Sequence, residues 1–231
     1  IRDSSGKQVS AVATESIEGY ALRTLEKIKD PQNLRNAVIS MVNYGADAQT
    51  HFGYRTLETD HLANANLTGL SDAEMALDGK TVTATDHTKS DGSIGLGGTT
   101  VTAEANLYLT FYFKDITETK DNLTACISYT DHYNRTETIT IPGSSFVSVK
   151  NSDGDTLYGP RVTGIAMADG RALITCELKD GDTTLATAVS SVESYAAYNL
   201  EHSANEALKA VCNNMINFVD YVKAYFDNPK A

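Results

Sequence analysis

The sequence contains no tryptophan and only three cysteines. The absence of tryptophan removes the side chain with the largest flat face for stacking on a sugar. Because Cys126, Cys176 and Cys212 are odd in number and far apart, they form neither a disulfide framework nor a set of metal ligands, and we expect buried thiols. No apolar run reaches the roughly 18 residues of a membrane-spanning helix. We therefore expect no insertion into a membrane.

Positive charge is also scarce. Lys and Arg number 19 against 30 Asp and Glu, which gives a formal net charge of −11. A protein of this sign repels the phosphate backbone, so we expect no nucleic acid partner. The apolar fraction, 41%, is ordinary, and 231 residues are enough to bury a core, so a folded protein is expected rather than a disordered one.

The motifs of common catalytic sites are absent as well. Gly95, Gly97 and Gly98 are not followed by the Lys-Ser or Lys-Thr that completes a phosphate-binding loop. The five histidines are scattered without the spacing of metal ligands, and no serine stands in a Gly-x-Ser-x-Gly turn. We therefore predict that the chain is not an enzyme and has no catalytic residues.

What the sequence does contain is an internal repeat. Tyr20 and Tyr195 are 175 positions apart (195 − 20), and at this offset residues 16–21 align with residues 191–196. The offset then falls by one, and three residues of the first copy align with identical residues of the second: Met41, Asn43 and Phe52 with Met215, Asn217 and Phe226. Agreement over such a span indicates two copies of one unit.

Each copy has the pattern of two helices joined by a short turn. Apolar residues recur every three or four positions in both copies, and Gly53 stands where a helix C-cap is expected. We assign residues 15–56 to the first helical hairpin and 190–231 to the second. Residues 1–14 align with the segment before the second hairpin, so we expect them to form a strand or hairpin that belongs to an upstream repeat.

Between the hairpins, at residues 57–189, the apolar period changes to two. In residues 105–113, for example, Leu107, Leu109, Phe111 and Phe113 share one face. Asp-Gly steps separate such segments, and the Gly-rich stretch 92–98 is expected to be a flexible loop. We predict an α+β fold: an antiparallel β-sandwich of about seven strands, similar in size to an immunoglobulin domain, flanked by two αα-hairpins that are sequence repeats of each other.

The repeat also has a characteristic residue pattern. Both copies contain Ser-Ile/Val-Glu-x-Tyr-Ala, and residues 41–54 read Met-x-Asn-Tyr-Gly-Ala-x-Ala-Gln-x-x-Phe-Gly-Tyr. This pattern resembles repeat modules in large secreted and surface proteins of anaerobic Gram-positive bacteria. The resemblance covers both hairpins and, more loosely, residues 106–113. It implies an extracellular location, neighbouring repeat modules of the same polypeptide as partners, and no catalytic residues to carry over.

Two sets of residues are candidate binding sites. Asn151, Asp153 and Asp155 place oxygen ligands at alternate positions, as calcium loops do, although position 162 is valine where such a loop needs a bidentate glutamate. A plain turn is the alternative, and calcium is the only cofactor that we consider. Tyrosine rings can stack on sugars, and an exposed row on the sandwich would suit this role; the candidates are Tyr129, Tyr133 and Tyr158.

The sequence therefore favours a non-catalytic structural or adhesive module, one repeat of a larger bacterial surface protein. Two alternatives remain open: a carbohydrate-binding module on the sandwich, and an accessory region of an extracellular hydrolase. The expected partners are neighbouring repeats and, beyond them, a glycan or a protein of the host or the cell wall.

Overall fold

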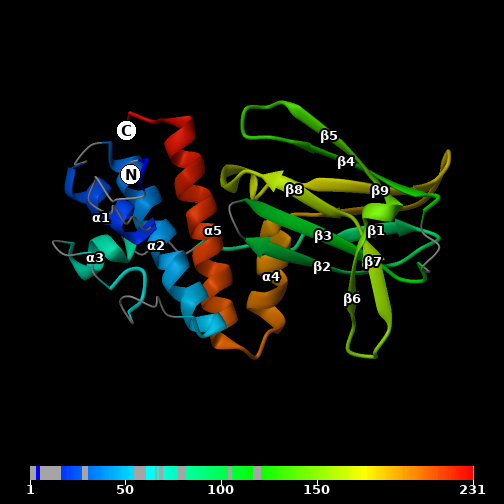
Figure 1. Ribbon diagram of the computed structural model, residues 1–231, viewed down its shortest axis with the longest axis horizontal. Helices are drawn as coiled ribbons and strands as arrows, with labels where there is room; N and C mark the ends of the chain where they lie inside the picture. The colour runs from blue at the N-terminus through cyan, green and yellow to red at the C-terminus, as the bar shows by residue number, and fades with distance from the viewer. Residues whose placement is uncertain are drawn as a thin grey trace.

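A computed structural model describes residues 4–5, 17–27, 31–54, 61–65, 67, 70–77, 82–103, 106–116 and 121–230. The protein is an α+β structure with two antiparallel sheets beside a group of helices (Figure 1). The strand predicted for residues 1–14 lies outside the described residues, apart from a turn at Ser4 and Ser5. In the described part of the chain, no helix is long and apolar enough to cross a bilayer.

Each sheet has five strands. The first has the order β1 (Lys89–Gly92), β10 (Thr183–Ser190), β9 (Ile174–Asp180), β4 (Leu123–Thr130) and β5 (Thr136–Pro142). The second has the order β2 (Leu96–Ala103), β3 (Leu107–Phe113), β7 (Thr156–Gly159) and β6 (Val147–Lys150), and β8 (Arg161–Ile165) also pairs with β3. The described strands thus outnumber the seven or so expected, because short strands such as β1 and β7 carry little apolar alternation.

One core lies between the sheets. Phe111 and Phe113 of β3 are fully buried together with Ile127 of β4 and Leu178 of β9. The alternation of apolar residues in β3 places one face of this strand toward the other sheet, as the sequence pattern requires. The arrangement is sandwich-like. Residues 96–98, expected to be part of a flexible loop, instead begin strand β2.

Four longer helices lie on one side of the sheets. They are α1 (Ile17–Lys27), α2 (Gln32–Phe52), α4 (Val192–His202) and α5 (Glu206–Asp227), and a short helix, α3 (Asp72–Met75), packs near α2. Gly53 ends α2 with a left-handed backbone, φ 70°, and donates its N–H to the carbonyl of Gln49, which confirms the predicted cap. Helix α1 contacts α2, α4 contacts α5, and α2 contacts α5.

Helix α5 lies between α2 and the sheets (Figure 1) and takes part in both apolar cores of the protein. Met215 and Ile216 are buried in the core of the two sheets, whereas Tyr221 is buried in a second core with α1 and α2. Its hydroxyl donates to the carbonyl of Leu77, 3.1 Å away. An amphipathic helix normally buries one apolar face. Helix α5 buries two apolar faces because it lies between the two cores.

A polar network fixes the sheets to the helices. Arg171, just before β9, donates to both carboxylate oxygens of Asp220 in α5, at 2.6 and 2.9 Å, and also to Glu193 in α4. The neighbouring Gly170 lies so close to α5 that a β-carbon there would be 2.4 Å from Cγ2 of Val219. Because Gly170 has no side chain, the segment before β9 can pack closely against α5. Because Arg171 is paired with Asp220 and Glu193, its charge is not left unpaired between the sheets and the helices.

Candidate functional site

The three tyrosines predicted to bind sugars lie on different elements. Tyr129 is in β4 of the first sheet, and Tyr158 is in β7 of the second, opposite Phe113. Both pack partly against the sandwich core. Tyr133 is exposed in the turn after β4, where its ring lies 6.4 Å from that of Phe226. The structure therefore does not place all three in one row of a single sheet.

The predicted calcium ligands form a turn between β6 and β7. The side-chain oxygen of Asn151 accepts from the backbone N–H groups of Asp153 and Asp155, at 3.0 and 2.8 Å, and its amide donates to the Asp155 carboxylate. The oxygen of Asn151 is thus already used to hold the turn. Within the described ranges, no group of three or more His, Cys, Asp or Glu side chains is placed to hold a metal ion.

A buried acid–base pair, which sequence reasoning missed, lies at the end of β4. Asp169 accepts from the backbone N–H of His132 at 2.6 Å, and its carboxylate lies 2.7 Å from Nδ1 of the same residue. The Nε2 atom of His132 is buried and has no hydrogen-bond partner among the described residues. An aspartate that orients a histidine resembles two members of a catalytic triad, but no described residue stands as a nucleophile at Nε2 of His132.

The His132–Asp169 pair is surrounded by packed aromatic side chains. The ring of His132 packs between Tyr133 and Phe226 of α5, at centroid distances of 4.0 and 5.1 Å. The charge of Asp169 also contributes, after burial, to a raised pKa of Tyr129. Since residues 132 and 169 are 37 positions apart in no recognisable motif, only the fold could reveal the contact.

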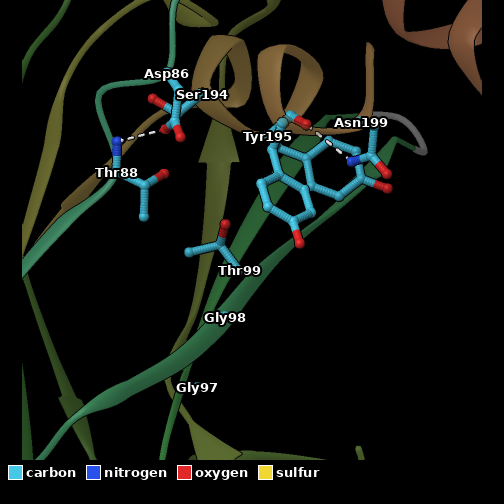
Figure 2. A pocket seen from close by; sticks show the side chains of 9 residues that line it. Asp86, Thr88, Gly97, Gly98, Thr99, Ser194, Tyr195 and Asn199 are labelled. Carbon is cyan, nitrogen blue, oxygen red and sulfur yellow. Dashed lines mark hydrogen bonds between the residues drawn. The ribbon is translucent and has the colours of Figure 1, made fainter. Parts of the chain in front are cut away.

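A cavity with many polar groups in its lining lies between α4 and strand β2 and has a volume of about 450 Å³ (Figure 2). Its lining combines a carboxylate, an amide, hydroxyls, two tyrosine rings and bare backbone; these residues are Asp86, Thr88, Gly97, Gly98, Thr99, Ser194, Tyr195, Tyr198 and Asn199. None of the described lining residues is a lysine, an arginine or a histidine. A cavity of this size with a few convergent polar groups and aromatic rings is suited to a small ligand.

The floor of the cavity is a distortion of strand β2. The register of β2 against β3 shifts between Leu96 and Gly98, so Gly97 is an extra residue in the strand. A β-carbon at Gly97 would lie 2.8 Å from Cδ1 of Leu157, and Gly98 has φ +150°, which residues other than glycine rarely adopt. The two glycines therefore permit a bulge that keeps backbone exposed beneath α4.

Hydrogen bonds within the wall hold the lining in place. Thr88 donates its N–H to one oxygen of Asp86 at 2.8 Å, and Asn199 donates its amide to the carbonyl of Tyr195 at 2.9 Å (Figure 2). Ser194 accepts from the N–H of His87 at 3.0 Å, which ties the segment before β1 to α4. Hydrogen bonds within and between α4 and the segment before β1 thus hold these polar groups in position.

A second cavity, mostly apolar and of about 460 Å³, lies where β2 faces α2 and α5. Tyr195 lines both cavities, and burial, followed by the proximity of Cys212, raises its pKa. Burial raises the pKa of Cys212 itself to about 11 and, with smaller effects of Cys126 and Glu177, that of Cys176 to about 12. These thiols are protonated near neutral pH and are poor nucleophiles.

Comparison with known proteins adds no relative: no protein family matches the chain, and neither do the curated proteins or the solved structures.

Proposed function

We propose that this chain is a non-catalytic structural module of a larger bacterial surface protein, in which two related helical hairpins pair and carry the sandwich between them. The observation that carries the proposal is the packing of α2 on α5. These helices correspond to each other in the proposed repeat, and they contact each other at corresponding positions.

The pairing is antiparallel. Asn33, near the start of α2, donates to the carbonyl groups of Ala224 and Asn228 at the end of α5, at 3.2 and 3.0 Å. Toward the other end, Asn214 of α5 donates to Asp47 of α2 at 2.5 Å. The start of each helix therefore lies beside the end of the other, as Figure 1 also shows.

The register of this pair is centred on equivalent residues. Tyr44 corresponds to Phe218 at the offset of 174 (218 − 44), and the two rings stack with centroids 6.2 Å apart. A residue that contacts its own counterpart lies on a local two-fold axis, which is the geometry of a self-complementary interface.

The two ends of the pair support this symmetry. Leu34 corresponds to Leu208, and His51 corresponds to Tyr225, at the same offset. Leu34 and Tyr225 pack against one apolar core, whereas Leu208 and His51 together line the apolar cavity. Corresponding residues thus gather at opposite ends, as rotation about an axis at Tyr44 would place them.

A two-fold contact is closed, because each surface is used by its counterpart and none is left to extend the assembly. Hairpins related in this way pair in twos rather than stacking without limit. Residues 57–189 leave the first hairpin and return to the second, so the pairing closes this long loop and gives the sandwich a rigid base. This arrangement suits a scaffold.

Cross-linking tests the pairing in solution. In an Asp47→Cys/Asn214→Cys variant we expect a short bis-maleimide to join the two helices and to raise the unfolding temperature. The matched control, Asp47→Cys/Asp227→Cys, moves the second thiol by about 20 Å along α5, so its two thiols should not be cross-linked to each other. Equal cross-linking of both variants, or of neither, would contradict the proposed arrangement.

We place the module outside the cell on the resemblance of its hairpins to bacterial surface repeats. Neighbouring repeats of the same polypeptide are its proposed partners, and a glycan or a host or cell-wall protein would be its external target.

A further inference from the structure

The cavity between α4 and β2 has the features of a built site and not of a gap between loops. One wall is a helix capped by the Ser191 side chain, which accepts from the N–H of Ser194 at 2.9 Å. The other wall is a strand held against β3 along its length. Both Ser191 and Ser194 are fully buried, so this side of the cavity is rigid.

Charge restricts what the cavity can bind. Among the described residues that line it, Asp86 is the one ionic side chain and none is cationic. Phosphate, sulfate or a carboxylate would therefore meet repulsion without compensation. A cation would also bind weakly here, because Asp86 is exposed to solvent and one of its oxygens already accepts a hydrogen bond from Thr88. A neutral ligand meets neither difficulty.

The groups left for a ligand are of two kinds. Several polar atoms make no hydrogen bond to any described residue: the second carboxylate oxygen of Asp86, the amide oxygen of Asn199, and the hydroxyls of Thr99, Tyr195 and Tyr198. Beside them, the Tyr198 ring is 56% exposed and offers a flat apolar face. Acceptors and hydroxyls around an aromatic ring match a molecule that carries hydroxyls on its edge and C–H groups on its face.

A pyranose sugar has this chemistry. Its ring hydroxyls both donate and accept, so a carboxylate, an amide oxygen and hydroxyls can all pair with it, and its C–H face packs on an aromatic ring. A volume of about 450 Å³ is within the range of small-molecule sites. We propose that the cavity formed by Asp86, Thr99, Tyr198 and Asn199 binds a neutral saccharide, with Tyr198 as the stacking platform.

This site differs from the tyrosine surface considered from the sequence. It also does not depend on the pairing of α2 with α5, because its lining comes from α4, β2 and the segment before β1. Loss of sugar binding would therefore leave the proposed scaffold function untouched, and failure of the helix cross-link would leave the sugar site untouched.

Saturation-transfer NMR on the whole chain provides the test. The probes are glucose, galactose and N-acetylglucosamine, with tetramethylammonium as a cationic probe and acetate as an anionic one. We expect transfer to at least one of the sugars, and competition between that sugar and its oligomers for the same site. Transfer to none of the sugars, or stronger binding of tetramethylammonium or acetate than of any sugar, would overturn the proposal.

Variants locate the site. Tyr198→Ala and Asp86→Ala change exposed side chains, so the fold should remain intact, which circular dichroism checks. Each should weaken sugar binding by about tenfold, as expected for the loss of one stacking or charge-assisted contact. Tyr133→Ala is the matched control, because Tyr133 is an equally exposed tyrosine that does not line this cavity. If only Tyr133→Ala weakens binding, the site is wrongly placed and the surface near Tyr133 is the binding face.

Discussion

Tyr44 of α2 stacks on Phe218 of α5, with ring centroids 6.2 Å apart and an angle of 24° between the ring planes. Tyr44 also packs against the core of the sandwich, and burial, with smaller effects of Cys212 and Tyr195, raises the pKa of its hydroxyl. A single residue thus contacts the second hairpin and the sandwich at once. If the two hairpins are a scaffold, this contact should contribute measurably to stability.

A double-mutant cycle measures that contribution. We expect Tyr44→Ala and Phe218→Ala to be coupled by about 0.5–1.5 kcal/mol in the free energy of unfolding, because each variant removes the other's ring partner. Urea denaturation of the two single variants and the double variant gives the value. Pairing Phe218→Ala with Tyr54→Ala serves as the control, since Tyr54 is 69% exposed and coupling near zero is expected. A coupling free energy near zero in the first cycle would show that Tyr44 does not contribute to the contact between α2 and α5.

The two aligned methionines should differ in their sensitivity to charge. Met215 is 2% exposed in the sandwich core, so Met215→Asp places an unpaired charge among apolar side chains and should destabilise the fold by about 4 kcal/mol or more. Met41 is only partly buried, and Met41→Asp should cost about 1–2 kcal/mol. Urea unfolding ranks the two. The opposite ranking would mean that α2, and not α5, carries the main core contact.

At acid pH, the Asp131 carboxylate in the turn after β4 should lose its contribution to the stability of the folded protein. Burial alone would raise the pKa of Asp131, but hydrogen bonds from the Arg135 side chain and from the backbone N–H groups of Arg135 and Tyr133 outweigh it and lower this pKa below the ordinary 3.8. A carboxylate whose pKa is lower in the folded state stabilises the protein fully above its unfolded pKa, and the effect is lost as the pH falls through the folded value.

The Asp131→Asn variant tests this contribution. At neutral pH it should unfold at a lower temperature than the wild type, and the difference should shrink as the pH falls below 3.8. Thermal unfolding followed across this range gives the result, with Asp153→Asn, at an exposed position, as the control. A difference that stays constant with pH would show that the asparagine acts through packing and not through lost charge.

The thiols should be inert in the folded protein. With a pKa of about 11, only about one Cys212 thiol in a thousand is ionised at a mildly alkaline pH of about 8, and Cys176 is buried as well. We expect a disulfide reagent to leave both unmodified in the native state, to react slowly with the partly buried Cys126, and to modify all three thiols in urea. Rapid native labelling of Cys212 would show that the apolar cavity opens to solvent.

Local patterns predicted the local structure. The four apolar side chains at 107, 109, 111 and 113 indicated strand β3, and Gly53 indicated the end of α2; both predictions are confirmed. Periodicity and turn chemistry depend on neighbours in sequence, so a single chain contains this information. The bulge at Gly97 was missed, because glycines in a row are equally typical of a loop and of a distorted strand.

The candidate site could not be predicted from the sequence for a different reason. Asp86 and Asn199 are more than a hundred positions apart and line one cavity only because α4 packs on β2 and on the segment before β1. Alignment alone is also a poor guide to burial: Tyr20 and Tyr195 align, yet Tyr20 is 60% exposed, whereas Tyr195 packs against the sandwich core. Packing partners, and not the residue pattern, decide which copy of a repeated side chain is buried.

The central claim is that the two hairpins pair as one structural unit, and amide hydrogen exchange at α2 and α5 tests it most directly. The account predicts that amides at the contacting positions of both helices, around Tyr44 and Phe218, exchange through a common opening with the same free energy. It would be contradicted if α2 exchanged at a markedly lower free energy than α5, because the first hairpin would then only rest on a unit that is complete without it.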